Sequence, residues 1–169
     1  CIVNPNTPEC SFASKNLAGV GVMFYVLMAL RAEFRNRGKF DVRTQPRLDE
    51  LVDLVALGTV ADVVKLDRNN RILVQQGLAK VRCGHTHPGV TTLFEIAGRA
   101  SAQARVRDFG FVIGPRINAA GRLDLMNAGI ECLISESDAE AQHYAKILDD
   151  YNRQRRELEL NMQWDAAIL

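Results

Sequence analysis

The sequence is poor in several features that would narrow its class. Its 169 residues include only four cysteines and five prolines, and aromatic residues make up 7%. The cysteines form no CxxC pair, which excludes a disulfide-built scaffold and indicates free thiols in a reducing compartment. Lysine plus arginine number 21 against 20 aspartate plus glutamate, so the net charge of +1 gives no basic excess typical of nucleic-acid binding. Any phosphate-binding site must therefore be local.

Long apolar runs are also lacking. The longest, from Leu17 to Leu30, is too short for a membrane span and lies too far inside the chain for a signal peptide. Hydrophobic residues at 47% and charged residues at 24% are ordinary for a globular domain. We therefore expect a cytoplasmic protein without a membrane partner. The opening Cys1-Ile-Val-Asn-Pro is typical of a strand entering a loop, so we expect a fragment of a longer protein.

Helical periodicity and capping residues dominate the pattern. They predict five helices: one capped by Ser14 and running to about Gly38, one over 48–57 that Gly58 interrupts, one from Asp67 to Gly84, one from Pro88 to near Gly98, and one from the capping box of Ser137 and Glu140 to the C-terminus. Strand-like alternation is weak except in the first residues and at 132–134. The last helix would extend roughly 45 Å, either as a strut toward another domain or as a truncated core helix.

Asp62 is the first candidate for a functional residue. It lies within Leu57-Gly-Thr-Val-Ala-Asp-Val-Val64, where its neighbours are valines and alanine. A charged carboxylate in such surroundings would be costly to desolvate unless a cation or several donors met it. A metal ligand meets that requirement, whereas the structural alternative is an aspartate that caps the next turn through its side chain.

A second candidate site lies in Gly114-Pro-Arg-Ile-Asn-Ala-Ala-Gly-Arg-Leu-Asp124. Asn118 and Arg122 are four residues apart and would share one face of a helix. Arginine grips phosphate oxygens in a bidentate way, and asparagine adds a directed donor, so Arg116, Asn118 and Arg122 are candidate phosphate ligands. The structural alternative is arginine paired with Asp124 or bound to terminal carbonyls.

A third candidate is the pair Ser14 and Lys15, which precedes the apolar run of the first expected helix. Free amides and the helix dipole favour an anion at a helix N-terminus, so these two residues could assist a phosphate site. The structural alternative is that the serine serves only as a cap.

Four stretches are highly specific when they are taken together and in order. They are Asn4-Pro-Asn6, Ser14-Lys15 with Leu17-Ala-Gly-Val-Gly-Val22, Leu54-Val-Ala-Leu-Gly-Thr-Val-Ala-Asp-Val-Val64 and the segment 114–124. Continued to Leu148-Asp-Asp-Tyr-Asn-Arg-Gln-Arg155, they resemble the DHH phosphoesterase family and, within it, the single-strand-specific 5′→3′ DNA exonucleases. The resemblance implies an α/β parent fold, of which this fragment is predominantly α-helical with little strand and ends in a long connecting helix.

The resemblance also implies roles for the candidate residues. Asp62 would be a catalytic ligand of Mn²⁺ or Mg²⁺, and Asn118 and Arg122, with Arg116, would hold phosphates of single-stranded DNA. Residues 1–136 would form the C-terminal part of the catalytic domain, and 137–169 would lead to a second domain. The implied parent is a monomer in DNA repair and recombination, with a single-stranded-DNA-binding protein and a helicase as its further partners.

The family's other metal ligands come from DxD and DHH motifs, and neither motif occurs in these 169 residues. We expect those motifs upstream of Cys1, and because one carboxylate cannot build an oxygen-rich metal site, we expect the fragment alone to be inactive. Lys65, where the family favours proline, and Leu125, where an acidic residue is common, remove no expected ligand. Two rival hypotheses are a DHH phosphoesterase acting on short oligonucleotides or cyclic dinucleotides, and a non-catalytic helical module that docks a partner.

Overall fold

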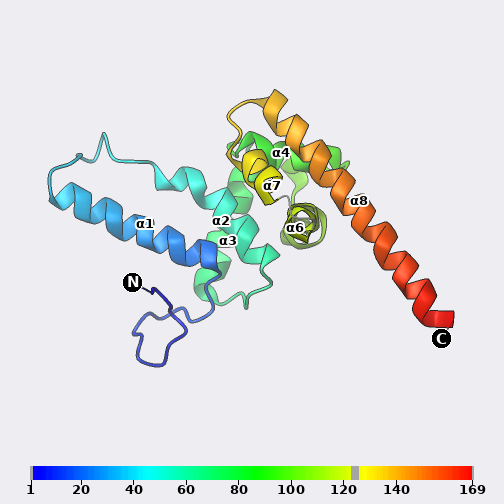
Figure 1. Ribbon diagram of the computed structural model, residues 1–169. Helices are drawn as coiled ribbons and strands as arrows, with labels where there is room; N and C mark the ends of the chain where they lie inside the picture. The colour runs from blue at the N-terminus through cyan, green and yellow to red at the C-terminus, as the bar shows by residue number, and fades with distance from the viewer. Residues whose placement is uncertain (1, 123–125, 169) are drawn as a thin grey trace. The chain divides into compact units, whose positions relative to one another are not determined.

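The computed structural model describes residues 2–122 and 126–168, without the side chains of 122 and 165–168, and it builds this part of the chain from helices joined by loops (Figure 1). No strand occurs within these ranges, which confirms the expectation of a predominantly α-helical fragment. The residues group into two compact units, Cys1–Lys80 and Val81–Leu169, which are described in turn. Among the described helices, none has both the length and the apolar character needed to cross a membrane.

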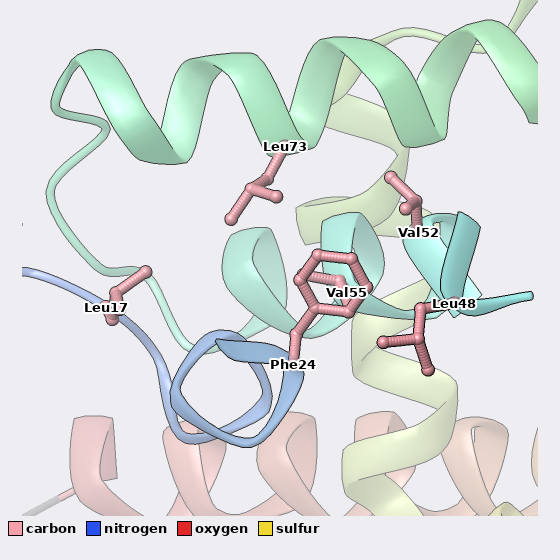
Figure 2. Packing of buried hydrophobic residues seen from close by; sticks show 6 residues of the cluster. All are labelled: Leu17, Phe24, Leu48, Val52, Val55 and Leu73. Atoms are coloured by element: carbon pink, nitrogen blue, oxygen red, sulfur yellow. The ribbon is translucent and has the colours of Figure 1, made fainter. Parts of the chain in front are cut away.

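The first unit contains α1 (Gly19–Asn36), the 3-10 helix η1 (Leu48–Leu51), α2 (Val52–Ala61) and most of α3 (Arg68–Arg82). These elements and the loop before α1 contribute to one apolar core, drawn in Figure 2, whose members are at most 9% exposed: Leu17, Phe24, Leu48, Val52, Val55 and Leu73. Burying side chains of this size contributes roughly 1.5–3 kcal/mol each, so the core fixes α2 between α1 and α3.

Two glycines allow α2 to approach its neighbours closely. A Cβ atom added to Gly58 would lie 2.7 Å from Val20 Cγ1, and one added to Gly77 would lie 2.4 Å from Ala56 Cβ. Our expectation that Gly58 interrupts the second helix is therefore wrong, because α2 continues to Ala61. The close contact with Val20 outweighs the low helix propensity of glycine.

The start of α1 also differs from the expectation. The helix begins at Gly19, with Ala18 at its N-cap and no side-chain capping bond. Ser14 lies in the preceding loop, where its hydroxyl donates to Asp67 Oδ2 at 2.7 Å. The prediction that Ser14 caps the helix is wrong, because a carboxylate 53 residues away competes for the hydroxyl.

The second unit contains α4 (Pro88–Ile96), η2 (Ser101–Gln103), α5 (Val106–Asp108), the π-helix η3 (Phe109–Ile113), α6 (Gly114–Arg122), α7 (Met126–Ile134) and α8 (Asp138–Ile168). Helices α4, α6 and α7 all pack against α8. The rings of Phe94 and Phe109 meet edge to face, with centroids 6.2 Å apart. A Cβ atom at Gly89 would lie 1.8 Å from the Cys132 carbonyl oxygen, so α4 approaches α7 to backbone contact.

Local sequence signals placed most helix ends correctly. Asp67 Oδ1 accepts the Asn70 N–H at 2.9 Å and so caps α3. Gly84 and Gly98, with φ of 72° and 66°, follow α3 and α4 in the left-handed conformation that glycine tolerates. Ser137 caps α8, because the Glu140 N–H donates to Ser137 Oγ at 3.3 Å, and the Ser137 hydroxyl donates to Glu140 Oε2 at 3.0 Å.

The two strand-like segments are not strands. Residues 132–134 belong to α7, where Cys132 is fully buried among helices, and residues 2–4 have no regular structure. Three residues are too few to distinguish a strand from one face of a short helix, so the expectation at 132–134 is wrong for lack of length.

The last helix, α8, is long, as expected, with 31 residues or about 46 Å at 1.5 Å per residue. Its first half packs in the core, where Ala141, Ala145, Leu148 and Asn152 are at most 2% exposed. Its second half does not, and the apolar side chains there are between 55% and 70% exposed: Leu158, Leu160, Met162 and Trp164. Its role as a connection to a second domain stays a prediction.

Candidate functional site

Asp62 is the residue directly after α2 and acts as its C-cap, with its N–H donating to the Gly58 carbonyl at 2.9 Å. Its side chain is exposed and makes no hydrogen bond or ion pair within the described ranges. Our expectation that apolar neighbours desolvate this carboxylate is wrong, because the chain turns outward here. The alternative, a side chain that caps the next turn, finds no supporting bond either. The carboxylate oxygens are available to a ligand.

The residue after Asp62 has an unusual backbone. Val63 has φ of 55°, and its side chain is 86% exposed. This left-handed conformation is costly for a β-branched residue and persists only where the surroundings impose it. Here the flanking α2 core and the capping bond from Val63 N–H to the Val60 carbonyl, at 3.1 Å, impose the turn that presents Asp62. Sequence reasoning missed this strain, since nothing in a valine predicts it.

Ser14 belongs to a hydrogen-bond network at the start of α3. Asp67 Oδ2 accepts from the Ser14 hydroxyl at 2.7 Å and from the Asn16 amide at 3.4 Å. Burial acts to raise the pKa of Asp67, but hydrogen bonds from the Asn70 N–H, Ser14 and Asn16 outweigh it, so that pKa lies below its ordinary value. Ser14 is only 5% exposed, so its hydroxyl serves this network first.

Lys15 faces away from that network. Its ammonium donates to the Cys10 carbonyl and, at 3.5 Å, to the Thr7 carbonyl. The lysine therefore closes the loop of residues 7–15 onto itself. Because α1 begins four residues later, at Gly19, the two residues do not lie at a helix N-terminus, and that part of the reasoning for an anion site is wrong. No described hydrogen bond joins Asp62 to Ser14 or Lys15.

The segment from Gly114 forms α6, which places Asn118 and Arg122 one turn apart, as expected of a helix. Asn118 is exposed and its amide has no protein partner within the described ranges. The side chain of Arg122, together with Asp124 and Leu125, lies outside the described residues.

Arg116 is held inside the second unit. Its Nε and Nη2 atoms lie 2.9 and 2.8 Å from Asp149 Oδ1 on α8, and Nη1 donates to the Val112 carbonyl at 2.6 Å. The residue is 9% exposed. The structural alternative for Arg116 was an ion pair with Asp124 or bonds to terminal carbonyls. The structure shows an ion pair with Asp149, 33 residues away, and a bond to the Val112 carbonyl. The two helices that this pair joins could not be paired from sequence spacing.

Comparison with known proteins identifies the segment. No protein-family model matches the chain. A curated relative, the single-stranded-DNA-specific exonuclease RecJ of Dickeya dadantii (strain 3937), is 53% identical over 170 residues, which cover 99% of this chain. The chain belongs to the RecJ family. It spans about 30% of the length of that relative.

Solved RecJ structures agree with this assignment. A crystal structure of Thermus thermophilus RecJ in complex with Mn²⁺ matches with a TM-score of 0.74 and 33% identity, and it covers 94% of this chain and 22% of that one. A second, of RecJ from the same organism in complex with Mg²⁺, matches with a TM-score of 0.73 and 34% identity over 90% and 22% of the two chains. The family assignment from the ordered motifs is confirmed.

The described residues do not form a metal site of their own. No group of three or more His, Cys, Asp or Glu side chains lies close enough together to hold an ion in residues 2–122 and 126–168, where these are described. Within these ranges the side chains therefore form no complete site for a divalent ion, and the exposed Asp62 carboxylate could contribute one oxygen ligand to a site completed by other residues.

Proposed function

We propose that this chain is part of a single-stranded-DNA-specific 5′→3′ exonuclease that hydrolyses phosphodiester bonds with Mn²⁺ or Mg²⁺. The observation that carries the proposal is the 53% identity to a RecJ exonuclease over 99% of the chain. The same relationship supports a place in DNA repair and recombination, in the cytoplasm, for a monomeric parent protein.

Asp62 supplies one oxygen ligand to the metal site in this proposal. Its carboxylate is exposed, has no described protein partner and follows a helix whose core packing fixes its position. Hard divalent cations take six or more oxygen ligands, so the remaining ligands must come from outside the described residues. The bound ions would activate water and offset charge on the scissile phosphate. The chain alone is therefore inactive.

Phosphate groups of the strand bind α6 in this proposal. Asn118 offers an exposed amide, and Arg122 follows one helical turn later. Arg116 was expected to join them, but its ion pair with Asp149 leaves it better suited to hold α6 against α8 than to reach DNA. In this proposal Ser14 and Lys15 assist phosphate binding less than α6 does, because each side chain already donates a hydrogen bond to a protein acceptor.

The long helix α8 provides the structural link in the proposed parent. Residues 1–136 would complete the catalytic domain, and the exposed second half of α8 would lead to a second domain. A single-stranded-DNA-binding protein and a helicase are the partners we propose for the parent.

The test uses the full-length protein that carries this segment and compares Asp62→Asn with Glu95→Gln. Both changes convert an exposed carboxylate to its amide, and Glu95 lies on α4 without a described side-chain partner. We expect Asp62→Asn to slow Mn²⁺-dependent shortening of a long 5′-phosphorylated single strand about 100-fold or more, as expected for loss of a metal ligand. Calorimetric Mn²⁺ binding should weaken in parallel, and Glu95→Gln should match the wild type.

Two results would contradict the proposal. Equal rates for all three proteins would make Asp62 a structural residue and would favour a helical module without catalytic function. Rapid hydrolysis of dinucleotides or cyclic dinucleotides, with long strands left intact, would assign the parent to another branch of the DHH phosphoesterases.

A further inference from the structure

A polar cavity of about 240 Å³ lies in the second unit, in the segment between α4 and η3. It is lined by Arg99, Ala100, Gln103, Arg105, Arg107 and Asp108, here called the arginine pocket. None of these residues belongs to the site proposed above. The pocket is smaller than the cavities that hold drug-sized ligands, so it suits a single small group.

The backbone around the arginine pocket is well tied down. Arg99 follows the α4 C-terminus, where its N–H donates to the Phe94 carbonyl at 2.9 Å. The Ala104 carbonyl accepts Arg82 Nε at 2.8 Å, and Asp108 Oδ2 accepts the Arg105 N–H at 2.7 Å. These bonds hold the three arginines on one short, folded segment.

Among the residues that the structure describes, the guanidinium groups of the pocket have no counterion. No ion pair or side-chain hydrogen bond is formed by Arg99, Arg105 or Arg107 within the described ranges, and all three are exposed. Asp108 is the one acidic residue in the lining, and it already caps α5 through the Arg105 N–H. Three positive charges and one negative charge therefore leave an excess of two positive charges around a small cavity.

We propose that the arginine pocket binds a phosphate group of a single nucleic-acid strand. Arginine's planar fork matches phosphate oxygens bidentately, and an excess of positive charge matches a phosphate better than a neutral ligand. A carboxylate of an acidic peptide is also negatively charged, so charge alone does not exclude it. The overall charge of the chain is only +1, yet three arginines without a described partner gather here. A nucleic-acid strand carries a phosphate at every nucleotide along its backbone, and one of these phosphates can reach the recessed pocket.

The test measures binding of a fluorescein-labelled oligo-dT strand of about 20 nucleotides to the 169-residue chain by anisotropy, over a range of salt concentrations. The double variant Arg99→Ala/Arg107→Ala is compared with Lys39→Ala/Arg43→Ala, which removes two exposed charges that lie outside the arginine pocket and have no described side-chain partner. We expect roughly tenfold weaker binding for the pocket variant, the size of one charge-assisted contact. The slope of log K against log salt should flatten by about 0.7, the value for one phosphate of a single strand.

The control variant should bind like the wild type, and circular dichroism should show equal helix content in all proteins. If the double alanine variant loses helix, Arg99→Lys/Arg107→Lys is measured instead, and binding should weaken while the salt slope stays unchanged. If the pocket and control variants bind the strand equally well, the arginines of the pocket contact solvent and not phosphate, and the proposal is overturned.

Two competitors separate the possible ligands. The first competitor is poly-glutamate. If it displaces the labelled strand at a lower concentration than unlabelled oligo-dT does, and only from the protein that keeps the arginines, the pocket binds an acidic protein and the proposal is overturned. Arginine-dependent binding of dTMP without arginine-dependent binding of the strand would assign it to a free nucleotide and would also overturn it. This proposal rests on the proposed function, but the two fail separately, because the anisotropy assay contains no metal ion and measures strand affinity rather than hydrolysis.

Discussion

The ion pair between Arg116 and Asp149 is expected to stabilise the second unit strongly. Arg116→Met keeps the length of a largely buried side chain and removes its charge. The change deletes two contacts to Asp149 Oδ1, at 2.9 and 2.8 Å, and the 2.6 Å hydrogen bond to the Val112 carbonyl. Among the described side chains, Asp149 then retains Arg153, at 3.3 Å on the same helix, as its basic partner.

The expected loss follows from these contacts and from burial. Removing one partner of a buried pair costs about 3–5 kcal/mol, and one charge-assisted hydrogen bond contributes about 1.5–3 kcal/mol. The Asp149 side chain is 22% exposed and keeps a second arginine, so solvent and Arg153 offset part of the loss. We expect a decrease in the free energy of unfolding of about 2–3 kcal/mol. For a chain of this length the melting temperature should fall by roughly 4–12 °C.

The assay is thermal and urea unfolding followed by circular dichroism, for Arg116→Met, Asp149→Asn and the double variant. The coupling energy between the two positions should be about 1–2 kcal/mol. Arg153→Met is the control, because its side chain is 65% exposed and it should cost no more than about 1 kcal/mol. If Arg116→Met is as stable as this control, the guanidinium does not hold α6 to α8, and the phosphate role first expected for Arg116 regains its place.

Three further predictions concern the first unit and the thiols. Val63→Gly should raise the free energy of unfolding by about 1 kcal/mol, because relief of roughly 1–3 kcal/mol of left-handed strain exceeds the roughly 0.5–1 kcal/mol entropy cost of glycine; a lower urea midpoint would contradict this. Hydrogen bonds hold the pKa of Asp67 below its ordinary value of 3.8. The ionised carboxylate therefore stabilises the fold fully above pH 3.8, and this contribution to the free energy of unfolding is lost as the pH falls through the lower pKa of the folded state. Asp67→Asn should make the free energy of unfolding depend less on pH in this acid range, as measured by urea unfolding at several pH values. Burial raises the pKa of the Cys132 thiol to about 11. A thiol reagent at a pH of about 8 should therefore label the exposed Cys83 quickly and Cys132 only when the protein unfolds. Equal labelling rates for the two thiols would contradict the buried position of Cys132.

Sequence reasoning succeeded where a structure depends on neighbours in the chain. The Ser137 cap, the Asp67 cap and the turn at Gly98 each involve groups at most five residues apart. It failed for Ser14, where the decisive acceptor is 53 residues away, because a hydroxyl beside an apolar run has the same pattern whether or not it caps a helix.

The candidate site shows the same division. The family and the order of its motifs were readable from the sequence, because 53% identity preserves many consecutive residues. The Arg116–Asp149 pair was not, since it depends on how α6 packs against α8. The outward turn at Asp62 and the arginine pocket were missed for a similar reason: apolar neighbours in sequence are not neighbours in space, and scattered arginines resemble a solvated surface until the fold gathers them.

The division of α8 into a packed half and an exposed half has a mechanical consequence. Residues 138–152 are clamped in the core of the second unit, while residues 153–164 extend from it as an arm of about 18 Å. A tilt of about 5° in the clamped half would displace the end of that arm by roughly 1.6 Å, a distance comparable to half a hydrogen-bond length. Repacking around Leu148 that tilted the clamped half would therefore move the far end of the helix much further than the packed residues themselves.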